Sequence, residues 1–346
     1  MRRFKRLRHC KIVFMRIAIV KLSSLGDIVH AMVVLQFIKK FNYEISIDWI
    51  VEECYKDLLE YHPDINKVHL VKLKQAKKKK SLYLLYKELS RISKLDAYDL
   101  VIDMQGLIKS ALISKLIPSK QNIGFDKYSS REKIASIFYK KTFQYDYGKN
   151  IVERNFELIK FALKMTADKD MIKNKNPFLF ARQILKISTL SKTKKNIVLV
   201  PGASNLAKRY SITNFKKLIN LLDANYFVIW GNDEEKNIAT KLLNSSSRVN
   251  LCDKLSIDLL ISLIIQVDLV IGPDTGPTHI AWALNKPSLT LFGPTPGYRN
   301  TYETRINKIL ESDSSVNPLK IDKKDLSIDE IKAEKIAELA QKILLS

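Results

Sequence analysis

The sequence predicts an α/β protein built from two Rossmann-like, doubly wound domains that face each other across a cleft. Short apolar runs rich in Ile and Val alternate with helical patterns along the chain, which is typical of parallel sheets covered by helices. The chain has 346 residues and is 46% hydrophobic, so it can fill two cores.

Two series of strands define these domains. Strands of the first are expected at residues 16–20, 45–51 and 100–103, with helices near 28–40, 83–95 and 107–116. Strands of the second are expected at residues 196–200, 226–230, 269–272 and 288–292. Ligands of open α/β sheets bind beyond the carboxyl ends of the strands, so functional residues are expected in the loops that follow them.

The chain divides into four expected segments. Residues 1–14 form a basic leader, either a disordered arm or a stretch ahead of a start at Met15. The N-terminal domain covers 15–180 and the C-terminal domain covers 181–325, with a polar linker between their cores. The segment 326–346 is a helix with no strand after it, for which packing back on the N-terminal domain is one arrangement.

The charge of the chain predicts an anionic partner. Its formal net charge is +23, with basic residues concentrated in the leader and in the run Lys72–Lys80. A nucleic acid, an acidic membrane surface and a phosphorylated substrate would all fit that charge. Nucleic acid is the weakest of these, because neither an aromatic stacking platform nor a recognition motif is present.

The lack of a recognisable targeting signal and the spacing of the cysteines predict an ordinary cytoplasmic protein. No apolar stretch approaches the roughly 20 residues that a membrane-spanning helix needs, and no signal-peptide pattern is present. The three cysteines are widely separated and lack the spacing of a zinc site or a disulfide framework.

The loop after the first strand carries the first candidate for chemistry. Asp27 lies where this loop opens a helix, so it is either a helix cap or a base at the cleft. The loop lacks the Gly-x-Gly-x-x-Gly fingerprint, which argues against a dehydrogenase. Asp103, at the end of a later strand, is the next candidate for a base.

Three loops of the second domain favour a nucleotide diphosphate. The turn from Asp274 to His279 opens a helix, whose free N–H groups suit a phosphate. Lys208 follows another strand and would neutralise a leaving diphosphate, although a solvated basic loop is equally open. Glu234 and Glu235 either bind ribose hydroxyls or form the acidic first turn of a helix.

A metal site is not expected. The only Asp-x-Asp string, Asp168-Lys169-Asp170, lies in the polar linker and not at the end of an apolar strand. No other cluster of His, Cys or carboxylate residues has the spacing of metal ligands.

Together these loops resemble the lipopolysaccharide heptosyltransferases of glycosyltransferase family 9, from Met15 to the C-terminal helix. The matching pieces are Lys21-x-Ser23-Ser24-x-Gly26-Asp27-x-x-His30, Asp103-Met104-Gln105-Gly106-Leu107-Ile108-Lys109-Ser110, Ser130-Arg131-Glu132, Asp274-Thr275-Gly276-x-x-His279 and Gly293-Pro294-Thr295. The resemblance implies a GT-B fold, inversion at the anomeric carbon, an ADP-heptose co-substrate and neither cofactor nor metal.

The resemblance also implies roles for single residues. Asp27 matches the general base and Lys208 the lysine on the donor diphosphate. The other donor contacts that it implies are Ser204, Glu235, Leu255, Asp274, Thr275, Gly276 and His279. Leu255 stands where the family often has a methionine.

The implied acceptor is the Kdo residue of Kdo-lipid A, because the first two pieces look more like type I members of the family than type II members. The acceptor contacts that it implies are Ser24, Gly26, Lys74, Lys77, Gln105, Lys109 and Arg131. Lys74 and Lys77 stand where arginines are common, and this change loses the bidentate fork for carboxylates and phosphates. Such an acceptor implies a peripheral position on the cytoplasmic face of the bacterial inner membrane. A type II or other GT-B acceptor is the alternative.

Overall fold

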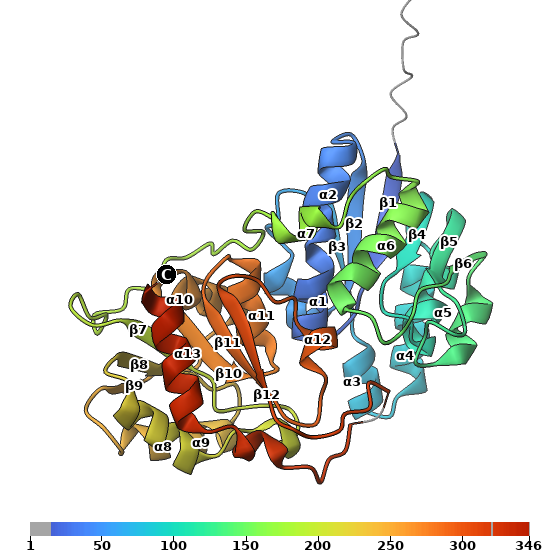
Figure 1. Cartoon of the computed structure of the whole chain (residues 1–346). Helices are drawn as coiled ribbons and strands as arrows, with labels where there is room; N and C mark the ends of the chain where they lie inside the picture. The colour runs from blue at the N-terminus through green and yellow to red at the C-terminus, as the bar shows by residue number, and fades with distance from the viewer. Residues whose placement is uncertain (1–14, 320, 346) are drawn as a thin grey trace, which may run out of the picture.

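The computed structural model describes residues 15–319 and 321–345, so the basic leader lies outside the described residues. Two six-stranded parallel sheets stand side by side, each covered by helices (Figure 1). The first has the order β3-β2-β1-β4-β5-β6 and the second β12-β11-β10-β7-β8-β9. Counted from its own first strand, each sheet therefore has the doubly wound order typical of dinucleotide-binding folds.

The N-terminal sheet and its helices extend to residue 173. Its strands are β1 (Arg16–Val20), β2 (Ser46–Glu52), β3 (Lys67–Val71), β4 (Tyr98–Asp103), β5 (Ser119–Phe125) and β6 (Lys141–Phe143). Its helices are α1 (Leu25–Met32), α2 (Val34–Phe41), α3 (Leu73–Lys78), α4 (Leu82–Ile92), α5 (Ile108–Leu116), α6 (Ile151–Leu163) and α7 (Asp170–Lys173), with short 3-10 helices η1 (Glu53–Leu58) and η2 (Lys133–Phe138).

The C-terminal sheet begins at residue 196. Its strands are β7 (Asn196–Leu199), β8 (Asn225–Val228), β9 (Val249–Leu251), β10 (Leu269–Pro273), β11 (Ser288–Phe292) and β12 (Asn307–Glu311). Its helices are α8 (Ile212–Leu221), α9 (Asp233–Leu243), α10 (Ile257–Gln266), α11 (Gly276–Ala283), α12 (Gly297–Asn300) and α13 (Ala333–Leu345), with 3-10 helices η3 (Leu206–Lys208) and η4 (Ser327–Glu330).

The strands expected from sequence are those that lie deepest. All five residues of β10 and of β11 are buried, because helices cover both faces of a parallel sheet. The strands that the sequence pattern did not reveal include the sheet edges. There β3 exposes Lys67, β6 has only 3 residues, and β12 is partly solvated.

Residues 175–195 contain no helix or strand and carry the chain from one domain to the other. The final helix, α13, then packs on the C-terminal domain against α8, not on the N-terminal domain. Its apolar residues Ile336, Ala340 and Ile343 belong to the core of the second sheet, so the apolar stripe of this helix is used there. No helix of the described residues is long and apolar enough to span a bilayer.

Candidate active site between the two domains

Two helix N-termini meet between the domains. Helix α1 follows β1 and helix α11 follows β10, the strands at which the order of each sheet reverses. A Cβ atom on Gly26 would lie 2.4 Å from Cδ2 of His279, and one on Gly276 would lie 2.3 Å from Cδ2 of Leu25. Each helix thus presents a glycine to a side chain of the other, and this permits the close approach.

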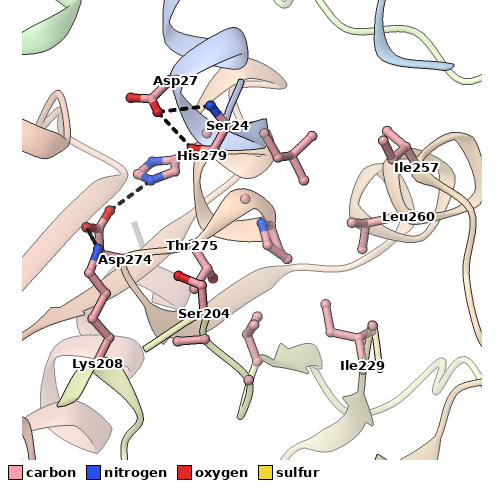
Figure 2. A pocket seen from close by; sticks show the side chains of 18 of the residues that line it. Ser24, Asp27, Ser204, Lys208, Ile229, Ile257, Leu260, Asp274, Thr275 and His279 are labelled. Carbon is pink, nitrogen blue, oxygen red and sulfur yellow. Dashed lines mark hydrogen bonds and ion pairs between the residues drawn. The ribbon is translucent and has the colours of Figure 1, made fainter. Parts of the chain in front are cut away.

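A cavity of about 510 Å³ lies at this junction and takes its walls from both domains. Figure 2 shows an apolar end, with Ile229, Ile257 and Leu260, and a polar end with Asp27 and Lys208. This volume is in the range of small-molecule sites. The division into an apolar end and a charged end suits a molecule with an aromatic base at one end and a diphosphate at the other.

Asp27 lies half-buried in the first turn of α1 and faces this cavity. Its Oδ2 accepts hydrogen bonds from the backbone N–H of Ser24 at 3.1 Å and from Ser24 Oγ at 2.7 Å. Burial favours a higher pKa for Asp27, but the nearby charge of Lys21 and the bonds from Ser24 outweigh it and lower the pKa. Asp27 is therefore both a helix cap and an ionised carboxylate that can accept a proton.

Lys21 lies buried beneath this loop. Its Nζ donates to the carbonyl of Met104 at 2.9 Å, and burial lowers the pKa of its ammonium. Gln105 holds the same loop, because its Oε1 accepts from the N–H groups of Leu22 and Ser23 at 2.9 and 3.1 Å. The loop that carries Asp27 is thus fixed by neighbours from the loop after β4.

Asp274 is the centre of a charged network at the start of α11. Its Oδ2 lies 2.6 Å from Lys208 Nζ, and its Oδ1 lies 3.0 Å from His279 Nε2 (Figure 2). Burial works against this carboxylate, but Lys208 and His279 more than compensate and hold its pKa well below the usual range. Asp274 thus fixes the only lysine ammonium among the side chains that line this cavity.

His30 occupies the contact between the domains, one turn after Asp27. Its ring centroid lies 4.3 Å from that of His279 and 5.7 Å from that of Trp282. Burial, followed by the charge of His279, lowers the pKa of His30 well below its ordinary value. Its Nε2 has no hydrogen-bond partner among the described residues, which fits a neutral imidazole used for packing.

All of the expected donor residues line the first cavity. They are Ser204, Lys208, Glu235, Leu255, Asp274, Thr275, Gly276 and His279. The structure also separates two adjacent acids. Glu235 accepts from the N–H of Gly231 at 2.7 Å inside the cavity, whereas Glu234 is exposed and forms an ion pair with Arg209. Glu235 is therefore the one of these two acids that lines the cavity.

A second cavity of about 970 Å³ adjoins the first. Gln105 and Arg131 line it, whereas Ser24 and Gly26 line the first cavity. Three expected acceptor lysines are not part of either wall. Lys109 Nζ donates to Ser23 Oγ at 3.3 Å, Lys74 Nζ donates to Tyr55 OH at 2.9 Å, and Lys77 is exposed.

Two residues missed in the sequence lie where the cavities join. Arg299 and Asn300 line both cavities, together with Asp27 and Ile151. Asn300 donates to Asp274 at 3.3 Å. Arg299 reaches into the other domain, where its Nε donates to the carbonyl of Tyr147 at 2.9 Å and its guanidinium lies 4.3 Å from the ring centroid. The signal available in the sequence was their place in a loop after the expected strand 288–292.

Asp103 is not placed to act as a base. It is fully buried and lines neither cavity, and its oxygens accept from Tyr139 OH at 2.7 Å and from the N–H of Gln105 at 2.8 Å. Asp168 and Asp170 lie at the start of α7, where Asp170 pairs with Lys173 at 3.1 Å. Across residues 15–319 and 321–345, no group of three or more His, Cys, Asp or Glu side chains is arranged to hold a metal ion.

Comparisons with known proteins agree with this architecture. The model of glycosyltransferase family 9 (heptosyltransferase) matches residues 87–324. The lipopolysaccharide heptosyltransferase 1 of Campylobacter coli is 37% identical over 95% of this chain and 99% of its own length.

Two solved structures of the Escherichia coli heptosyltransferase WaaC share the fold. The structure with ADP has a TM-score of 0.78, is 23% identical and covers 95% of this chain and 100% of its own. The structure with ADP-2-deoxy-2-fluoro heptose has a TM-score of 0.76, is 23% identical and covers 95% of this chain and 99% of its own. The expected GT-B fold is thereby confirmed. The chain belongs to glycosyltransferase family 9, the heptosyltransferases.

Proposed function

We propose that this protein transfers L-glycero-D-manno-heptose from ADP-heptose to the Kdo residue of Kdo-lipid A, with inversion and without a metal ion. The observation that carries the proposal is the position of Asp27. It is the ionised carboxylate shared by the wall of a nucleotide-sized cavity and the wall of a second, larger cavity. A transferase needs a base at this place, between donor and acceptor.

The donor would lie in the first cavity. Its adenine would pack on the apolar end with Leu255 and Leu260, and its ribose would reach Glu235. The diphosphate would lie at the N-terminus of α11, where N–H groups and the helix dipole favour negative charge. A relative named for heptose transfer to lipopolysaccharide and a similar structure solved with an ADP-heptose analogue support this donor.

The acceptor would lie in the second cavity, beside Arg131 and Arg299. Kdo is an acid, and guanidinium groups suit its carboxylate. In the reaction, a Kdo hydroxyl oxygen attacks the anomeric carbon of heptose from the face opposite ADP while Asp27 takes the hydroxyl proton. The bond from the anomeric carbon to the diphosphate oxygen breaks, and ADP leaves with the electron pair. Lys208 and the α11 N-terminus stabilise the charge that develops.

Fixed positive charge at this place supports the proposal that no metal ion is used. Lys208 and the helix N-terminus would do what a divalent cation does in other transferases. We also propose that the protein works at the cytoplasmic face of the inner membrane, because its lipid acceptor is held there and its own charge is strongly positive.

The test is a mass-spectrometric assay of the purified protein with ADP-heptose and Kdo-lipid A, with and without EDTA. We expect one added heptose and equal rates with EDTA and without it. Activity that needs added Mg²⁺ or Mn²⁺ after chelation would contradict metal independence. Transfer only to an acceptor that already carries one heptose would favour a type II acceptor.

A further inference from the structure

Helix α4 exposes an unusual amount of apolar surface. Its first two turns carry Leu82, Tyr83 and Tyr86, which are 82%, 71% and 70% exposed. The helix itself is well anchored, because Ser81 caps its N-terminus and Leu89 and Ile92 pack into the core beneath it. Large apolar side chains gathered on one exposed helical face indicate an interaction surface.

Lysines surround this apolar face. Nine of the residues from 72 to 94 are Lys or Arg, and one, Glu88, is acidic. Glu88 is already paired with Arg91 at 2.9 Å. The lysines at positions 77–80 and Lys87 are exposed, and none has an ion pair within the described part of the chain. This surface is therefore strongly positive and favours a partner of opposite charge.

The surface leads to the mouth of the site. Helix α3 is tied to the wall of the first cavity, because Lys74 contacts Tyr55. Helix α4 packs on α5, which packs on η2, and Figure 1 shows α3, α4 and α5 grouped at one end of the N-terminal domain. Helix α5 and η2 add the exposed residues Ile108, Ile134 and Ile137. The loop before η2 carries Arg131, which lines the second cavity.

We propose that the α4 face is the docking surface for an anionic bilayer. The α4 face comprises Leu82, Tyr83, Tyr86, Lys78, Lys79 and Lys87. Tyr side chains suit the membrane interface, and lysines extend towards anionic head groups while their stems cover apolar surface. A second copy of the chain is a poor partner, because two such basic faces repel each other. The inference rests on the proposed function, which supplies a lipid-anchored acceptor that would enter the second cavity from this side.

The test measures sedimentation of the full chain with vesicles, without donor or acceptor. Vesicles of phosphatidylglycerol and phosphatidylethanolamine are compared with vesicles of phosphatidylcholine. An apolar variant carries Leu82→Ser, Tyr83→Ser and Tyr86→Ser, and a charge variant carries Lys78→Gln, Lys79→Gln and Lys87→Gln. A matched control carries Lys216→Gln, Lys217→Gln and Leu221→Ser on α8, where all three side chains are also exposed.

We expect the wild type to prefer the anionic vesicles, and each α4 variant to lose at least about tenfold in partitioning, since both apolar burial and charge contribute. The control should stay within about twofold of wild type. An apolar variant that binds anionic vesicles as wild type does would overturn the proposal. The proposal would also be overturned if the only effect of the apolar variant were to convert a dimer into a monomer. Leu82→Ser alone, with an expected smaller loss, replaces the triple variant if that fails to fold.

A transfer assay separates this inference from the proposed function. Transfer to a soluble, short-chain Kdo acceptor should be unchanged in the apolar variant, whereas transfer to an acceptor embedded in vesicles should fall. If neither the wild type nor the variants transfer heptose, yet their vesicle binding differs as expected, the proposed function fails and the docking surface stands. If transfer occurs and all variants bind vesicles equally, the docking surface alone fails.

Discussion

Lys208 Nζ and Asp274 Oδ2 lie 2.6 Å apart at the polar end of the cavity, and both side chains are largely buried. The same carboxylate holds His279, so one acid orients a cation and an imidazole on the surface that would receive a diphosphate. Asp274 thus acts by positioning Lys208 and His279. It keeps Lys208 at the start of α11, where positive charge is already concentrated.

Replacing Lys208 with Ala should weaken ADP binding and reduce turnover, since its proposed partner is the diphosphate. It should also lower stability by about 1–3 kcal/mol, because the buried Asp274 loses one of its compensating charges. Isothermal titration with ADP, transfer rates and thermal melts measure the three effects. Lys254→Ala, an exposed lysine of the same domain, is the control. Unchanged ADP affinity in Lys208→Ala would remove the lysine from the donor site.

Replacing Gly26 with Ala should impair transfer, because the new Cβ would lie 2.4 Å from Cδ2 of His279 and push the domains apart. Overpacking typically costs about 1–3 kcal/mol, which corresponds to a loss of roughly tenfold to a hundredfold in turnover if the closed arrangement is required. Gly148→Ala is the control, since its Cβ would meet only ordinary contacts. Full activity in Gly26→Ala would show that the close contact of α1 and α11 is not needed.

Stability should fall on mild acidification because of His30. Its folded pKa lies well below the ordinary value of 6.5, so between these values the unfolded chain binds more protons than the folded one. Its contribution is present above pH 6.5 and is lost as the pH falls towards the folded value, by up to about 1.4 kcal/mol per pH unit. Denaturant titrations from pH 8 to about pH 5 should show a shallower loss in His30→Leu. Equal slopes would exclude this role.

Arg299→Ala should raise the KM for the Kdo acceptor by about tenfold to a hundredfold, the range for a lost charge-assisted hydrogen bond. ADP affinity should change much less. Initial rates at varied acceptor and donor concentrations separate the two effects, with the exposed Arg305→Ala as control. A change confined to the donor would assign Arg299 to the diphosphate.

The sequence alone could predict those site residues that follow a buried apolar strand. Asp27 and Asp274 each follow a buried apolar strand that is recognisable in one dimension, and both face the same cavity. Arg299 and His30 depend on the docking of the two domains, which bring Tyr147 and His279 against them. Docking is a tertiary property without a local signal.

Lys74 and Lys77 show what position along the chain leaves open. Their place near the cleft follows from chain position, because α3 begins just after β3. The direction of their side chains does not follow from chain position. Lys74 is directed to Tyr55 and Lys77 is exposed. Helical side-chain direction is set by rotamer and neighbours, which position along the chain does not specify.

We propose that Asp27 is the general base and not only a helix cap. Asp27→Asn retains an oxygen that can accept the bonds from the N–H and Oγ of Ser24, so the cap should persist. The amide cannot take a proton from the acceptor. We therefore expect a melting temperature within a few degrees of wild type and near-normal ADP affinity.

The deciding measurement is the single-turnover rate of heptose transfer by Asp27→Asn at saturating donor and acceptor. We expect a loss of at least about a hundredfold, the lower range for removal of a general base. A variant that is folded, binds ADP and retains more than about a tenth of the wild-type rate would contradict it, because that loss is far smaller than a general base provides.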